Sequence, residues 1–80
     1  MPKPIKERIQ DAFKSGEREL HFYDLAARVF PENEYPKAWR YSSNGGPPGC
    51  AMALGRAIRE MGLDVRHVEG SSRFVRRPNH

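Results

Sequence analysis

Cysteine and long apolar runs are what this sequence has least of. Its single cysteine, Cys50, cannot form an internal disulfide, and no apolar run approaches the roughly 18 residues that a membrane-spanning helix needs. The opening Met-Pro-Lys-Pro does not lead into the apolar segment of a secretory signal. We therefore expect a reducing compartment, with the cytoplasm as the default, and no association with a membrane.

Acidic residues are missing from two stretches of the chain. The formal net charge is +4, and the basic residues that stand without acidic neighbours lie between Tyr35 and Arg59 and after Glu69. They are Lys37, Arg40, Arg56 and Arg59, followed by Arg73, Arg76 and Arg77. Basic charge collected on particular segments is typical of nucleic-acid-binding proteins, although small basic proteins without that role are common.

The residue spacings of metal and catalytic sites are also missing. One cysteine and three scattered histidines match no pattern of metal ligands, and the run Gly-Gly-Pro-Pro-Gly lacks the lysine and Ser/Thr of a nucleotide-binding loop. Cys50 falls in the first turn of a predicted helix, which favours a thiolate, but no histidine is spaced to act as its base. We therefore expect no catalysis, cofactor or metal, with Cys50 packed as an inert thiol and His21 serving as a strand or cap residue.

The length predicts one domain over residues 1–80, with 1–3 and 78–80 frayed, and apolar spacing predicts three helices in it. The first covers about residues 4–14. The second is a helix of about two turns that carries Leu25 to Phe30 and is ended by Pro31. The third has Gly46 as its N-cap, Pro47 and Pro48 in its first turn, and Gly62 as its left-handed stop.

The third helix has two different faces. Ala51, Leu54, Ile58 and Met61 share one side at 100° per residue, and we expect that side to be buried. The opposite side is small and apolar near the N-terminus and basic further along, and consists of Gly49, Met52, Arg56, Arg59 and Glu60.

Two β-leaning runs follow, residues 63–68 and 73–77, with a turn-forming connection between them. They predict a hairpin in which Val68 lies opposite Arg73 and His67 opposite Phe74. A further short edge strand is predicted at residues 19–22, immediately before the second helix.

Residues 31–46 form a long connection for so small a domain, and connections of this length are usually functional or disordered. Tyr35, Trp39 and Tyr41 predict order, because large aromatic rings fix a loop by packing, and we expect Trp39 to plug the core. The glycine-rich end has two interpretations. It turns the chain and caps the third helix, or it contacts an anion with Ser42, Ser43, Asn44 and the backbone at Gly46.

The order helix, short strand, helix, helix, hairpin resembles the winged helix-turn-helix superfamily of DNA-binding domains, over about residues 4–77. The resemblance implies an α+β winged-helix fold in which the third helix enters the major groove and the hairpin wing lies along the backbone or minor groove. It would place Gly49, Met52, Ala53, Arg56 and Arg59 at the groove, and Arg66, Arg73, Arg76 and Arg77 on the wing. The chain departs from the family at residues 31–46, where the family has a tight turn.

We therefore expect a non-catalytic protein that binds double-stranded DNA, as a small transcriptional regulator or accessory factor. The predicted contacts are those of the third helix and wing named above, except Ala53, together with Arg40 and the loop residues Ser42, Ser43, Asn44 and Gly46. One alternative is a protein-interaction module with an apolar patch of Tyr35, Trp39, Tyr41 and Met52. A Cys50-dependent enzyme is the third interpretation, and a protein partner or a homodimer is compatible with the first two.

Overall fold

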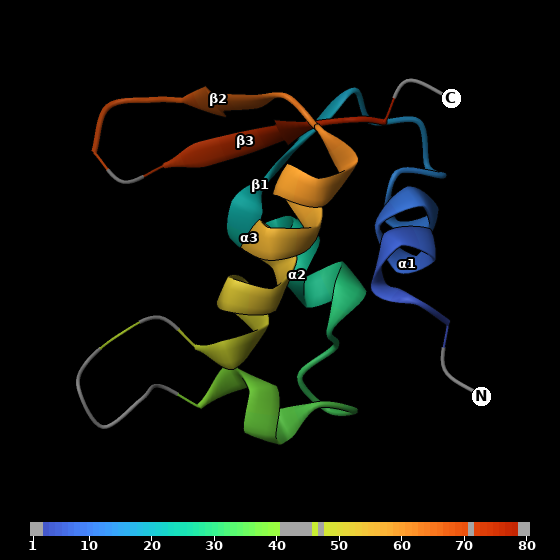
Figure 1. Ribbon diagram of the computed structural model, residues 1–80, viewed down its shortest axis with the longest axis vertical. Coiled ribbons are helices and arrows are strands. Elements are labelled where there is room, and N and C mark those ends of the chain that lie inside the picture. Colours follow the sequence, from blue (N-terminus) through green and yellow to red (C-terminus); the bar gives the residue numbers. More distant parts are fainter. Residues whose placement is uncertain (1–2, 41–45, 47, 71, 79–80) are drawn as a thin grey trace.

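The computed structural model describes residues 3–40, 46, 48–70 and 72–78, and their elements form an α+β arrangement (Figure 1). The order is α1 (Ile5–Ala12), β1 (Glu19–His21), α2 (Phe22–Val29), the 3-10 helix η1 (Pro36–Trp39), α3 (Gly49–Met61), β2 (Val65–His67) and β3 (Arg73–Arg76). The predicted helices, hairpin and short early strand are therefore confirmed. None of the helices in this described part of the chain is long and apolar enough to cross a membrane.

The three strands form one antiparallel sheet in the order β1-β3-β2, so β3 is central. The predicted hairpin register is wrong by one residue, because His67 pairs with Arg73 and Arg66 pairs with Phe74. The observed register places Val65 beside the fully buried Val75. A slip of one residue would turn the side chains of β2 to the other face of the sheet, which is why the core selects this pairing.

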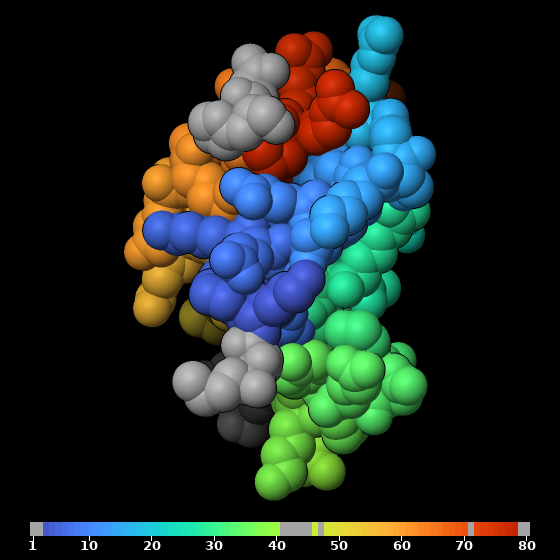
Figure 2. Space-filling model, turned by 90° about the vertical axis from the view of Figure 1, so that its right-hand side faces the viewer, coloured from blue at the N-terminus to red at the C-terminus, as the bar shows by residue number. Residues whose placement is uncertain are grey.

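The core lies where the three helices pack together beneath one face of the sheet (Figure 1). Its fully buried side chains include Ile9 of α1, Leu25 and Val29 of α2, Leu54 of α3 and Val75 of β3. In the space-filling view, α1 covers the side away from the hairpin tip, and η1 protrudes at the end opposite the sheet (Figure 2). One apolar cluster therefore joins every helix to the central strand.

The predicted buried side of α3 is largely confirmed. Leu54 is fully buried and Ile58 is 4% exposed, whereas Met61 is half-buried at the edge of the core. Cys50 and Ala57 widen the buried side. The opposite side, including Met52 and Arg56, is exposed to solvent as expected.

The predicted N-cap of α3 is wrong, whereas its predicted C-terminal stop is confirmed. The helix begins at Gly49 with Pro48 as its N-cap, so the assignment of the cap to Gly46 and of two prolines to the first turn is wrong. A residue followed by proline is disfavoured in helical dihedrals, so a proline pair does not form a helical turn. The stop is confirmed, because Gly62 has φ 67° and its N–H donates to the carbonyl of Arg59, while Leu63 N–H donates to that of Ile58.

His21 joins β1 to α2 in both of its expected roles. It is the last residue of β1, and its Nδ1 accepts a hydrogen bond of 3.2 Å from the backbone N–H of Tyr23. Phe22, expected to end the strand, instead begins α2. The strand therefore passes into the helix without a loop, which fixes α2 relative to the sheet.

The segment between α2 and α3 is ordered by aromatic packing over residues 30–40. The indole N–H of Trp39 donates to the carbonyl of Phe30 at 2.6 Å, and the half-buried ring packs against the core. Tyr35 meets the ring of Phe30 edge-on at 5.5 Å. The prediction that Trp39 orders this connection is confirmed. Tyr41 lies outside the described residues.

Candidate nucleic-acid interface

A groove of about 390 Å³ separates α3 from the β2–β3 hairpin. The wall on α3 contains Met52, Gly55, Arg56 and Arg59, and the wall on the hairpin contains Val65, His67 and Arg73. Between them the groove is lined by Phe22, Ala51 and Ile58. The exposed side of α3 and one face of the hairpin therefore form a single concave surface.

This groove is basic on both walls. Among the described residues, none of the side chains that line it is acidic, and Arg56, Arg59 and Arg73 form no ion pair with any described carboxylate. Unpaired guanidinium groups on facing walls raise the local concentration of an anion. Each also presents planar N–H donors suited to a phosphate.

Arg73 is held in place by Phe22. Its guanidinium carbon lies 3.9 Å from the centroid of the Phe22 ring, and that ring is buried in the core with 2% of its surface exposed. Stacking of this kind contributes about 0.5–1 kcal/mol at an exposed site. A guanidinium that lies over a ring can still donate hydrogen bonds from its N–H groups, so this contact restricts the position of Arg73 before any ligand arrives.

Strand alternation divides the hairpin arginines between the two faces of the sheet. Arg73 and the buried Val75 share the groove face, whereas Arg66, Phe74 and Arg76 belong to the other face. The sequence-based assignment placed Arg66, Arg73 and Arg76 on the wing without assigning them to its faces. The register gives Arg73 a different face from the other two.

Arg66 is already paired on the outer face of the sheet. It donates two hydrogen bonds to the carboxylate of Glu19, at 2.7 and 3.1 Å, and its guanidinium lies 4.8 Å from the centroid of the Phe74 ring. These hydrogen bonds lower the pKa of Glu19 and raise the pKa of Arg66. A second anion would therefore have to compete with Glu19 for this arginine.

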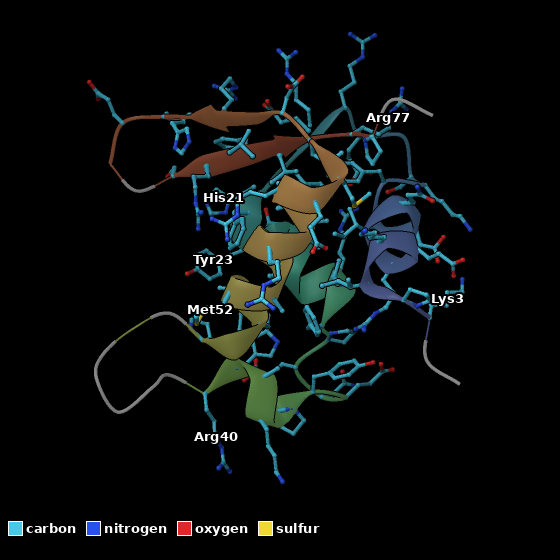
Figure 3. All side chains as sticks on the ribbon, viewed as in Figure 1. Lys3, His21, Tyr23, Arg40, Met52 and Arg77 are labelled. Atoms are coloured by element: carbon cyan, nitrogen blue, oxygen red, sulfur yellow. The ribbon has the colours of Figure 1, made fainter. Side chains whose placement is uncertain are left out.

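The remaining predicted contacts are spread around the molecule. Arg77 follows β3, donates its backbone N–H to the carbonyl of Arg18 at 2.8 Å, and lies far from Met52 (Figure 3). Arg40 is exposed directly after η1, and Gly49 is exposed at the start of α3. Gly46 is half-buried. Ser42, Ser43 and Asn44 lie outside the described residues.

Gly55, His67 and Phe22 line the groove and were missed from the sequence. Gly55 carried a signal, because glycine inside a helix costs about 0.5–1 kcal/mol relative to alanine and so suggests a packing or functional reason. In this structure an added Cβ at Gly55 would meet nothing within 4 Å, so packing within the chain does not explain it. His67 was missed because the predicted register was one residue out, and nothing local in the sequence pairs Phe22 with Arg73.

The aromatic residues of the protein-interaction interpretation and the cysteine of the enzymatic interpretation mostly make contacts within the domain. Tyr35 and Trp39 engage Phe30, and Arg8 of α1 places its guanidinium 4.6 Å from the Tyr35 ring centroid. Cys50 is 1% exposed, and burial raises its pKa, which is the reverse of an activated thiolate. In the described part of the chain, no three His, Cys, Asp or Glu side chains cluster closely enough to hold a metal ion.

Comparisons of the chain with models of protein families, with curated proteins and with solved structures find no match. Function is therefore inferred from the groove and its surroundings.

Proposed function

We propose that the chain is a winged helix-turn-helix domain that binds double-stranded DNA without catalysis, through α3 and the β2–β3 hairpin. The observation that carries the proposal is the convergence of Arg56, Arg59 and Arg73 on one groove in which no described lining residue is acidic. The order of the elements, with the hairpin directly after α3, supports the same fold family.

The exposed side of α3 suits a helix that lies close to DNA. Gly49 and Ala53 add almost no bulk near its N-terminus, and Met52 is 64% exposed without a described partner in the core. Arg56 and Arg59 lie about one and two helical turns after Met52. An arginine on such a face can make a bidentate contact with guanine, worth about 1–3 kcal/mol of discrimination.

The hairpin has a different role in this proposal. Arg73 is fixed by its stacking on Phe22, so it presents a cation at a constant place beside α3. A guanidinium at the edge of the groove contacts phosphate, which gives salt-dependent affinity that is independent of sequence. The hairpin would thus set the position of α3, and α3 would supply the preference for sequence.

A titration of the protein into duplex DNA at about 50 and 200 mM salt tests the proposal. Each cation that contacts a phosphate contributes about −0.9 to the slope of the logarithm of affinity against the logarithm of salt, which is about 3.5-fold in affinity over this range. Arg73→Ala should reduce that slope by about 0.9 on any sequence. Arg56→Ala should weaken a preferred sequence more than random duplex, and an equal loss on both would make Arg56 a phosphate contact instead.

Arg66→Ala is the matched control, because it removes the same charge from the opposite face of the sheet. We expect its affinity for DNA to stay near that of the parent protein at a temperature where both are folded. Absence of binding at about 50 mM salt would contradict the proposal and would favour the protein-interaction alternative, for which Met52 beside the groove offers an exposed apolar contact.

A further inference from the structure

Two cations lie beside the end of α3 opposite the hairpin, one in the 3-10 helix η1 and one directly after it. Lys37 and Arg40 are exposed, and neither forms an ion pair with a described residue. The acidic residues Glu32 and Glu34 precede η1 in the chain. We infer that η1 is a second phosphate-binding element, which contacts the DNA backbone on the far side of α3 from the hairpin. This inference rests on the proposed function.

The segment is fixed to the core from two sides, so the backbone that carries the two cations has a constant position. Trp39 donates to the carbonyl of Phe30 at 2.6 Å, and Tyr35 packs edge-on against the Phe30 ring. Arg8 of α1 lies over both rings, at 4.7 Å from the centroid of Phe30 and 4.6 Å from that of Tyr35, and donates a hydrogen bond to the carbonyl of Val29. The entropy of ordering η1 is therefore lost on folding and not on binding.

The position of η1 is set by its contact with the first turn of α3. A Cβ added to Gly49 would lie 3.9 Å from the carbonyl oxygen of Ala38, so the two helices meet there. At the other end, α3 runs toward the sheet, and Arg59 lines the groove together with Arg73 of β3. The residues of α3 span about 20 Å at 1.5 Å per residue. Basic elements thus flank both ends of the exposed side of α3.

This spacing is compatible with one helix in a major groove about 12 Å wide and with contacts to the backbones on both sides of it. In Figure 3, Arg40 and Met52 lie toward the side to which the hairpin extends, whereas Lys3 lies on the opposite side. The long connection between α2 and α3 would accordingly act as a backbone contact that the hairpin cannot supply.

The test compares two double variants that lose the same charge. Lys37→Ala/Arg40→Ala removes the η1 cations, and Lys3→Ala/Lys14→Ala removes two cations around Asp11. We expect the η1 variant to reduce the slope of log affinity against log salt by about 1.8, with equal loss on preferred and random duplex, and the control to leave the slope unchanged. The charge-preserving variant Lys37→Arg/Arg40→Lys should keep the salt slope of the parent protein.

Thermal unfolding of each variant checks that the substitutions leave the fold intact, since both η1 side chains are exposed. A parent-like slope for the η1 variant would overturn the role of η1 while the proposed function stands. An equal reduction in both double variants would also overturn it, because the effect would then belong to net charge. Failure of the parent protein to bind duplex at about 50 mM salt would overturn the proposed function itself, and with it this inference.

Discussion

Arg73 of β3 stacks on the ring of Phe22, with 3.9 Å between the guanidinium carbon and the ring centroid. The contact connects the hairpin to the first residue of α2 and holds one cation at the edge of the groove. Because Phe22 belongs to the core, the position of Arg73 depends on the packing of the whole domain.

The first prediction concerns the geometry of that cation. Arg73→Lys keeps the charge but loses the planar group that stacks on Phe22, a contact of about 0.5–1 kcal/mol. We expect a two- to fivefold loss of DNA affinity with little change in salt slope, measured by fluorescence anisotropy. Arg66→Lys on the other face of the sheet is the control and should bind DNA like the parent protein.

The second prediction is that a substitution at Gly55 changes stability and DNA affinity in opposite directions. Gly55→Ala should raise the free energy of unfolding by about 0.5–1 kcal/mol, since alanine is the better helix former and its Cβ meets nothing within 4 Å. The same methyl group lies at the groove, so DNA affinity should fall. Urea denaturation and DNA titration of one variant give both quantities.

Gly16→Ala provides the opposite control for stability. Gly16 has φ 95°, so alanine should lower the free energy of unfolding there although open space surrounds the position.

A Gly55→Ala variant that is more stable and binds DNA at full affinity would show that the groove beside Gly55 is not occupied in the complex.

Part of this fold could be predicted from the sequence, and part of it could not. The stop at Gly62 and the hairpin follow from local patterns and are confirmed, and the buried side of α3 is confirmed apart from the half-buried Met61. The pairing of Glu19 with Arg66 depends on two strands far apart in the chain, so local spacing gives no sign of it. The hairpin register was missed because both strands mix polar and apolar residues, and only the buried position of Val75 selects it.

The candidate site divides in the same way. Arg56 and Arg59 were predicted on the exposed side of α3 from the helical period alone, and they are exposed there. The groove could not be foreseen, because it requires the hairpin to fold back beside α3 in one register. The order of η1 follows from Trp39, whose ring packing was predicted but whose hydrogen bond to Phe30 was not.

The Glu19–Arg66 pair predicts a pH dependence of stability. Hydrogen bonds from Arg66 lower the pKa of Glu19 in the folded protein. The contribution is therefore fully present above the ordinary carboxyl pKa of about 4.3 and is lost as the pH falls through the lowered value. We expect the difference in unfolding free energy between the parent and Glu19→Gln to be constant near neutrality and to shrink below about pH 4. A difference that grew on acidification would refute the assignment.

Cys50 should be a slow thiol. It is 1% exposed and burial raises its pKa, so both access and the thiolate fraction are reduced at neutral pH. We expect modification by a thiol-reactive dye at pH 7 to be at least tenfold slower than for free cysteine, and to reach the rate of free cysteine in denaturing urea. A rate above that of free cysteine in the folded protein would support the enzymatic interpretation instead.

The central claim is that the groove between α3 and the hairpin meets DNA. Amide chemical shifts recorded during titration with duplex DNA at about 50 mM salt test it most directly. We predict that the largest changes fall on residues 49–59 of α3 and on His67 and Arg73 of the hairpin, with little change along α1. Changes confined to α1 or to the outer face of the sheet around Arg66, or no changes at all, would contradict the account.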